Sequence, residues 1–490
     1  MAEYLHGAYG EINVAGTRVA DESQGAFVYV GTAPVHTVEG GAKNVNVPIV
    51  VNNIAEARKY LGYSEDWSKY TLCEAMHAHL ESKGVGPLIF INVLDPEKVK
   101  ASAAGNVTLT PSNGIVTIPS AESIILDSIV VKAGSTAKEN GKDYTAAYSV
   151  DKGTIVLKEA KSGAIGKDAL TITYNTVDAT KVTTQDVIGS SDGEGLNKGL
   201  FAVKDVYTKT GLIPSFLLAP GFSSIPAVHA AMFQNSSKVN GHWDVFMFTD
   251  LPLSADGTLE AAATFKNANG YTHENEKVFY PMAVGTDGHK YHLSVLNAAN
   301  LQEILATTDG IPYKSASNTA CPIISNLWIG ADQTGRVYDD AIINEKLCKN
   351  GISSAAFVGG RWAIWGAHCA DYNQEDATQI NVAETNRTML YYISNDFQER
   401  RMRDIDQPLT ANDINSIVAE EQTRLDALLN IGALTYANVE LNADTQAQSD
   451  ALNGDYSFAF QITTTPLAKS LTAVVSWTDD GFATYFESAE

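Results

Sequence analysis

A long stretch of unusual composition divides this sequence and limits the folds open to it. Residues 102–182 contain no Phe, Trp, Met, Cys, His or Arg and are rich in Thr, Ser, Val, Ile, Ala, Gly and Lys. Within it, VTLTPSNGIVTIP predicts a hairpin about its Asn-Gly turn, and AAYSVDKGTIVLKE predicts another. Short strands separated by turns are typical of an all-β domain. We therefore expect an inserted β domain whose two ends lie close together on the surface of its host.

Strands and helices alternate on both sides of this insertion. The runs FVYVGTAP, GPLIFINVLDP, LIPSFLLAPG and HWDVFMFTDLP are typical of buried strands. Helical spacing occurs over residues 53–61, over 70–82 and in PAVHAAMFQNSSKVNG, and SSAAFVGGRWAIWG indicates a strand pair about Gly359-Gly360. The alternation favours a largely parallel sheet covered by helices on both faces.

The last part of the chain has a different pattern. Two long helical patterns, ETNRTMLYYISNDFQERRMR and TANDINSIVAEEQTRLDALLNIGAL, are followed by strand-like segments, and Thr410 with Asp413 is spaced as a capping box. In the final segment, residues 471–478, apolar side chains alternate with more polar ones. A strand needs a partner for its backbone groups, and the sequence leaves open whether that partner lies in the same subunit.

These patterns predict a multidomain α/β fold, with a central α/β sheet domain, an inserted all-β domain and a C-terminal α+β domain. The predicted divisions are an N-terminal arm (1–20), a discontinuous central domain (21–100 with 186–376), the insertion (101–185), the C-terminal domain (377–468) and a C-terminal arm strand (469–490).

The net charge, the length of the apolar runs and the cysteines limit the partners and the chemistry of the chain. The net charge is −23, and after Arg403 fourteen acidic residues face one Arg and one Lys, so we expect neither nucleic acid nor an anionic membrane as the main partner. The apolar runs are too short to span a bilayer, and the first residues do not resemble a secretory signal. Cys73, Cys321, Cys348 and Cys369 form no CxxC pair, so we expect reduced thiols, mostly buried.

A search for catalytic motifs predicts no enzyme, no cofactor and no metal. GSTAKENGK has the wrong glycine spacing for a P-loop, GEGLNKG for a dinucleotide-binding loop, and neither GxSxG nor HExxH occurs. His77 and His79 would point from different faces of a helix, and His289 and His292 follow a turn signal. Asp371, Glu375 and Asp376 near His368 could form a catalytic cluster, but the pattern favours a solvated loop.

The order of several segments resembles a known family. FVYVGTAP, NVNVPIVVNNIAEARKYLG and GPLIFINVLDP, then GLIPSFLLAPGFSS, HWDVFMFTDLP, NEKLCKNGISSAAFVGGRWAIWGAH and YYISNDFQERRMRDIDQPLT, are similar to contractile tail sheath proteins of myovirus-like phages and related injection machines. The resemblance covers nearly the whole chain except the insertion. Each motif alone has little specificity, and their shared order carries the resemblance.

The resemblance implies a structural subunit in a bacteriophage tail, assembled in the host bacterial cytoplasm. Such subunits form stacked rings or a helix around an inner tail tube, meet baseplate and tail terminator proteins, and contract to drive the tube through a target envelope for genome ejection. The C-terminal domain would face the tube and the insertion would lie outside. The family's arms add strands to neighbouring subunits, which implies an inter-subunit strand carrying Leu471, Ala473, Val475, Trp477 and Phe482. No direct membrane insertion is implied.

The sequence leaves three questions open. Arg400, Arg401 and Arg403 would contact an acidic tube surface, or would pair within their own helix with Asp396, Glu399 and Asp404. The chain could belong to a phage or to a contractile bacteriocin or injection machine, which only gene neighbours would separate. From another class, an α/β enzyme with a β accessory domain would show turnover or a bound cofactor.

Overall fold

A computed structural model describes residues 25–253, 258–330, 336–376, 382–442, 454–479 and 481–482. The chain divides into two compact units, Met1–Gln407 and Pro408–Glu490. The N-terminal arm predicted for residues 1–20 lies outside the described residues.

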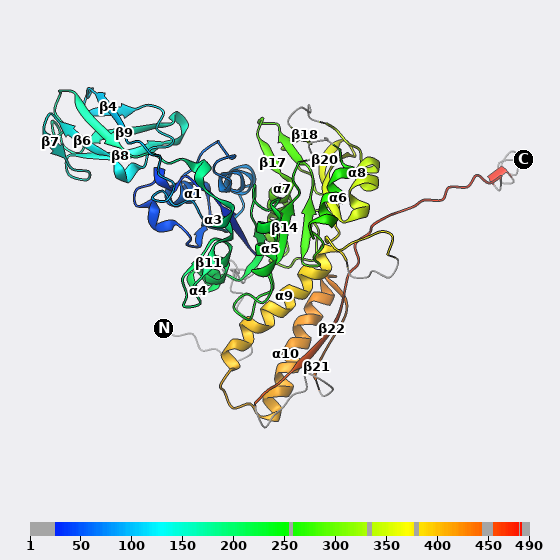
Figure 1. The fold of residues 1–490 in the computed structure, drawn as a ribbon. Helices are drawn as coiled ribbons and strands as arrows, with labels where there is room; N and C mark the ends of the chain where they lie inside the picture. Colours follow the sequence, from blue (N-terminus) through cyan, green and yellow to red (C-terminus); the bar gives the residue numbers. More distant parts are fainter. Residues whose placement is uncertain are drawn as a thin grey trace, which may run out of the picture. The chain divides into compact units, whose positions relative to one another are not determined.

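The first unit is built on an eight-stranded sheet in the order β2-β3-β1-β13-β14-β15-β19-β20 (Figure 1). Its strands are β1 (Ala26–Gly31), β2 (Ile49–Val51), β3 (Leu88–Asn92), β13 (Pro214–Leu218), β14 (Phe246–Asp250), β15 (Glu276–Phe279), β19 (Ile352–Val358) and β20 (Arg361–Trp365). The six inner strands run parallel, and β2 and β20 pair antiparallel at the two ends. The prediction of a largely parallel sheet is confirmed.

Both faces of this sheet are buried. Along β1, Phe27 and Tyr29 enter one hydrophobic core and Val28 and Val30 enter another, and none of the four is exposed. Because a strand alternates its side chains between faces, this continuous apolar run requires a cover on each side.

Helices from different parts of the chain supply the two covers. One core includes side chains from α1 (Ile54–Leu61), α2 (Leu72–Ala75) and α7 (Leu293–Thr307), and the other from α3 (Thr184–Ile188), α4 (Val206–Thr210) and α5 (Pro226–Gln234). The predicted helix over 53–61 begins at Asn53, whose side chain accepts from the Glu56 N–H at 2.9 Å. The helix predicted over 70–82 continues from α2 into a π-helical segment, Met76–Lys83, and ends at Gly84.

The first unit contains further helices and strands outside the main sheet. They are α6 (Glu260–Ala268), α8 (Asp340–Lys346), α9 (Glu384–Arg401), the hairpin of β11 (Ser190–Ser191) and β12 (Asn197–Lys198), and a small sheet of β16 (Met282–Gly285), β17 (Lys290–His292) and β18 (Ile324–Trp328).

Residues 105–174 form two β-sheets. One holds β4 (Gly105–Leu109), β6 (Val130–Ala133), β7 (Thr136–Lys138) and β10 (Leu170–Tyr174), and the other β5 (Ile115–Ile118), β8 (Tyr144–Ser149) and β9 (Thr154–Glu159). Both sheets contribute to a hydrophobic core that draws its buried residues only from this stretch. The hairpin predicted in AAYSVDKGTIVLKE is confirmed as β8 and β9.

The other predicted hairpin forms only at its turn, where Ser112 and Ile115 make an antiparallel bridge. Asn113 and Gly114 do form the tight turn, with φ of 52° and 73°. The strands that flank it lie in different sheets, however, since β4 pairs with β10 and β5 pairs with β9. The alternating apolar residues of β4 and β5 pack into the same core, so the chain crosses from one sheet to the other between them.

The second unit contains α10 (Ala411–Asn430) and an antiparallel pair, β21 (Leu434–Leu441) and β22 (Phe458–Thr464). The capping box at Thr410 and Asp413 is confirmed. Each strand of the pair has the other as its one strand partner among the described residues. The chain after β22 continues as an extended trace, and the final segment, residues 471–478, forms no strand in this single subunit (Figure 1).

The mixed α/β class is confirmed, whereas the finer division into domains stays a prediction. We expected the C-terminal domain to begin at residue 377, and the compact units instead meet at Gln407 and Pro408, which leaves α9 in the first unit. The physical reason is that α9 is anchored to the main sheet.

Candidate assembly surfaces

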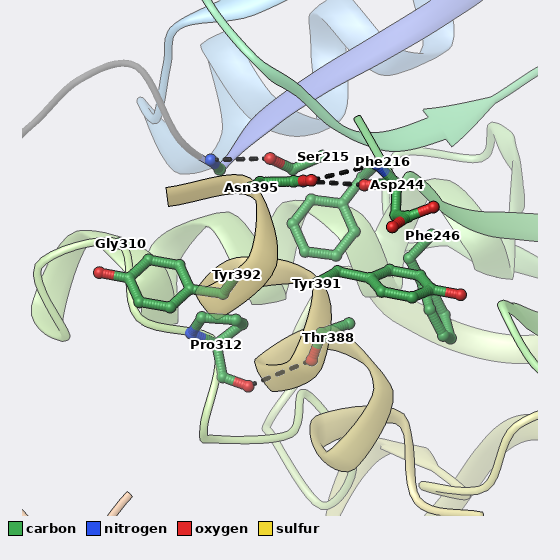
Figure 2. A pocket seen from close by; sticks show the side chains of 11 residues that line it. Ser215, Phe216, Asp244, Phe246, Gly310, Pro312, Thr388, Tyr391, Tyr392 and Asn395 are labelled. Atoms are coloured by element: carbon green, nitrogen blue, oxygen red, sulfur yellow. Dashed lines mark hydrogen bonds between the residues drawn. The ribbon is translucent and has the colours of Figure 1, made fainter. Parts of the chain in front are cut away.

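Helix α9 is fixed to the first unit along its length, as Figure 2 shows for its middle turns. Asn395 and Asp244 exchange two hydrogen bonds, from the Asp244 N–H to Asn395 Oδ1 at 3.1 Å and from Asn395 Nδ2 to the Asp244 carbonyl at 2.9 Å. One turn from its start, the Thr388 hydroxyl donates to the Pro312 carbonyl at 3.3 Å. These contacts hold the C-terminal end of α9, which carries the arginines, in a defined position.

The three arginines at the end of α9 differ in their exposure and in their distances to acidic side chains. Arg400 pairs with Asp396 one turn earlier, at 2.9 Å, and Arg401 pairs with Asp404 at 3.2 Å, with its side chain about 10% exposed. Arg403 is 75% exposed and reaches Asp404 only at 3.8 Å. The pairing predicted with Asp396 and Asp404 is therefore present. Cations at this end of a helix are also favoured by its dipole. The predicted tube contact stays a prediction, with Arg403 as its most accessible member.

The final segment presents its apolar side chains to solvent. Leu471 and Val475 are each 92% exposed, Trp477 is 80% exposed and Phe482 is 55% exposed, and Ala473 is exposed as well. Exposed apolar residues that are scattered singly are ordinary, but a continuous alternating run is typical of an interaction site. The segment has the pattern of a strand, and no strand of the described residues pairs with it.

The residues considered for catalysis have other contacts in the structure. His368 stacks on Tyr372 at 3.8 Å between ring centroids, and Asp371 lies 3.8 Å from Arg387. Burial raises the pKa of Asp371. Glu375 and Asp376 lie exposed in a turn, as the solvated-loop prediction expected.

The pocket beside α9 is small. It is lined by Gly25, Ser215, Phe216, Asp244, Phe246, Gly310, Pro312, Thr388, Tyr391, Tyr392 and Asn395 (Figure 2). Its volume of about 20 Å³ has room for roughly one water molecule. The pocket therefore belongs to the packing of α9 rather than to a substrate site.

His77 and His79 each form a hydrogen bond within the fold. His79 is buried, with Nε2 2.6 Å from the Tyr29 hydroxyl and Nδ1 2.6 Å from Gln302 Oε1, and burial lowers its pKa to about 4. His77 points elsewhere, with Nδ1 2.9 Å from the Tyr291 hydroxyl. The prediction that His77 and His79 do not share a ligand site fits this geometry.

The cysteines are free thiols, and Cys73, Cys321 and Cys369 are buried while Cys348 is half-buried. Burial raises the pKa of Cys73 to about 12, which keeps this thiol protonated and unreactive. Across the described ranges, no helix is both long and apolar enough to cross a membrane.

Sequence reasoning missed several buried polar contacts. His229 lies 2.8 Å from Glu276, His292 lies 2.7 Å from Glu74, and Lys277 lies 2.8 Å from Glu384. The partners are separated by 47, 218 and 107 positions, so no local spacing could have paired them. The charged residues inside otherwise apolar strands, as in EKVF, were the one available signal.

Comparison with known proteins gives one sequence relative and a shared fold. The chain is 31% identical to a tail sheath protein of Burkholderia phage BcepMu over 227 residues, which cover 45% of this chain and 44% of that protein. The chain thus spans less than half of the curated relative that it matches. No family model matches the sequence.

Two solved assemblies resemble the chain over nearly its full length. The helical sheath of the anti-feeding prophage in its contracted state has a TM-score of 0.52 and 11% identity, covering 98% of this chain and all of that one. The contracted PVC sheath complex of an extracellular contractile injection system gives the same TM-score, identity and coverage. Identity this low shows the fold alone. By sequence over 227 residues and by fold over most of its length, the chain resembles the contractile tail sheath proteins.

Proposed function

We propose that the chain is the structural subunit of a contractile tail sheath that polymerises around an inner tube and contracts to drive it through a cell envelope. The observation that carries the proposal is the final segment, an exposed apolar run of strand pattern that pairs with no strand in the described part of its own subunit. A second subunit would supply that partner.

Strand addition suits such a machine. Main-chain hydrogen bonds hold an added strand and alternate side chains fix its register, so the linkage persists while the bodies it joins rotate. Contraction would release free energy by forming larger or better-matched interfaces between subunits.

The partners of this proposal are further copies of the chain, an inner tube protein, a baseplate and a tail terminator, in a virion tail assembled in the host cytoplasm. The mechanism requires no active site. A contractile bacteriocin or injection machine would use the same subunit chemistry, and capsid genes beside this gene would favour the phage.

Electron microscopy of the full-length protein, beside a version that ends at Lys469, tests the proposal. We expect hollow tubes or striated rings from the full-length chain and monomers from the truncated one. Tubes from both would keep the sheath and reject the donated strand. Failure of both to polymerise, even with a tube protein present, would overturn the sheath function.

A further inference from the structure

Two histidines and a glutamate converge inside the first unit. His229 lies on α5, Glu276 opens β15, and His273 lies in the turn before that strand. One candidate ligand atom from each of the three lies within 4.8 Å of the other two. His229 and Glu276 are buried and His273 is half-buried, so one side of the cluster stays near solvent.

One oxygen of the Glu276 carboxylate lacks a hydrogen-bond partner among the described residues. Glu276 Oε1 lies 2.8 Å from His229 Nε2 and also accepts from the Thr249 hydroxyl. Its second oxygen, Oε2, is fully buried and has no hydrogen-bond partner among the described residues. A carboxylate oxygen left in this state costs considerable free energy, because it has lost water and gained nothing in return.

A buried lysine that interacts with Glu276 does not resolve this deficit. Lys266 is buried close enough to Glu276 to interact with it electrostatically, yet its ammonium donates to the Ala370 carbonyl at 2.6 Å. Glu276 Oε2 is therefore buried and accepts no hydrogen bond from Lys266 or from any other described residue.

The two imidazole rings are held in place by aromatic neighbours. His229 stacks on Tyr271 with centroids 3.7 Å apart, and His273 stacks on Phe233 at 3.6 Å with planes 7° apart. The centroids of the two histidine rings lie 5.3 Å apart. Rings fixed in this way lose little further freedom when they bind a ligand.

We propose that His229, His273 and Glu276 bind one divalent transition-metal ion, with zinc the ion that fits best. Two imidazole nitrogens and a carboxylate are a usual zinc donor set, whereas calcium and magnesium prefer oxygen ligands alone. The Thr249 hydroxyl, which donates to Glu276 Oε1, would orient the carboxylate toward the ion. The ion would tie α5 to the start of β15, and this inference does not depend on the sheath function.

The untagged full-length protein tests the site directly. We expect about one zinc per chain by elemental analysis after zinc loading and dialysis, and we expect cobalt substitution to produce the visible absorption bands of a low-symmetry site. Zinc should also raise the thermal unfolding midpoint of metal-stripped protein, because it binds only the folded state. Wild-type protein that retains no metal and gives no cobalt bands would overturn the proposal.

Variants assign the ligands. His273→Gln removes the half-buried ligand and should lose metal retention, cobalt bands and the zinc-dependent rise in midpoint, while the stripped protein unfolds as the wild type does. His242→Gln, at an exposed histidine outside the cluster, should keep all three. Equal retention in both variants would reject the site. If His273→Gln does not fold, Glu276→Gln serves as the second variant, with the same expected losses and the same rejecting outcome.

Discussion

Lys277 Nζ lies 2.8 Å from Glu384 Oε2, with the two side chains 0% and 5% exposed. The pair joins β15 to the first turn of α9, and it is completed by Asn297, 3.1 Å from the lysine, and by the Ser315 hydroxyl, which donates to the glutamate. A buried charge is tolerated when its partner and its hydrogen bonds are present. Together these contacts explain why α9 belongs to the first compact unit.

Removing one member of this pair should be costly. Lys277→Met leaves the Glu384 carboxylate buried without its cation, so we expect the free energy of unfolding to fall by about 3–5 kcal/mol. The double variant Lys277→Met with Glu384→Gln should recover part of this loss, because no uncompensated charge remains. Urea unfolding of the three proteins measures the difference.

A matched control uses an exposed pair. Lys142 lies 3.1 Å from Glu139, with both side chains about 70% exposed, so Lys142→Met should leave the unfolding transition unchanged. A loss from Lys277→Met no larger than that of the control would show that burial does not govern this pair.

The pattern of the sequence predicted the main sheet well and the buried charges not at all. Phe27 to Val30 are apolar at every position, and such a run dictates a strand with two covered faces. Asn113-Gly114 predicted its turn but not the sheets on either side, because turn chemistry acts locally while strand pairing depends on the shared core. Glu276 and Lys277 met partners that only the folded chain brings near.

The contact of His292 with Glu74 should make stability depend on pH. Burial by itself lowers the pKa of His292, but the Glu74 carboxylate at 2.7 Å, aided by Asp250, outweighs burial and raises it from 6.5 to about 9. Since the folded-state pKa lies above the unfolded one, the contribution is complete below about pH 6.5 and is lost as the pH rises through about 9.

Thermal unfolding at about pH 6 and about pH 10 measures this effect. The change in midpoint between the two conditions should be smaller in His292→Gln than in the wild type, with the difference arising from a less stable variant at low pH. Because other titrating groups contribute equally to both proteins, the comparison with the wild type isolates the contribution of His292. The exposed His242→Gln variant should show the same change in midpoint as the wild type. Identical pH profiles for all three proteins would contradict the assignment.

The β insertion should be removable. The Ala101 N–H donates to the Thr176 carbonyl at 2.8 Å and the Asp178 N–H donates to Val99 at 2.9 Å, so the two ends of the insertion are already joined. Replacing residues 102–175 by a short Gly-Ser turn should leave the rest folded and, under the proposed function, able to polymerise. Circular dichroism and electron microscopy test both points.

The same division predicts that residues 102–175 fold alone, because their core has no buried member outside that stretch. A cooperative unfolding transition of the isolated domain would support this. An unfolded domain, together with an unfolded excision variant, would mean that contacts such as His36 to the Glu122 carbonyl, at 2.8 Å, are required for folding.

Arg403 gives the clearest test of the predicted tube contact. Reversing Arg400 would place a second acid beside Asp396 and disturb the subunit itself, whereas Arg403 is mostly solvated. Arg403→Glu should therefore keep the unfolding midpoint and reduce polymerisation templated by the tube protein. Arg361→Glu, an exposed arginine on β20, reverses the same charge elsewhere and should polymerise normally. Normal polymerisation by both variants would argue that the arginines serve only their own helix.

Two neighbouring valines test the donated strand at the level of single side chains. Val474 is 88% exposed and Val475 is 92% exposed, so aspartate at either position should leave the isolated subunit equally stable. In a strand they point to opposite faces, and Val475 shares its face with Leu471, Ala473 and Trp477. Val475→Asp should therefore stop polymerisation, since it places a charge among the apolar side chains that would be buried, while Val474→Asp should weaken it less. Sedimentation and electron microscopy of the two variants measure the difference, and equal polymerisation by both would reject this face as the buried one.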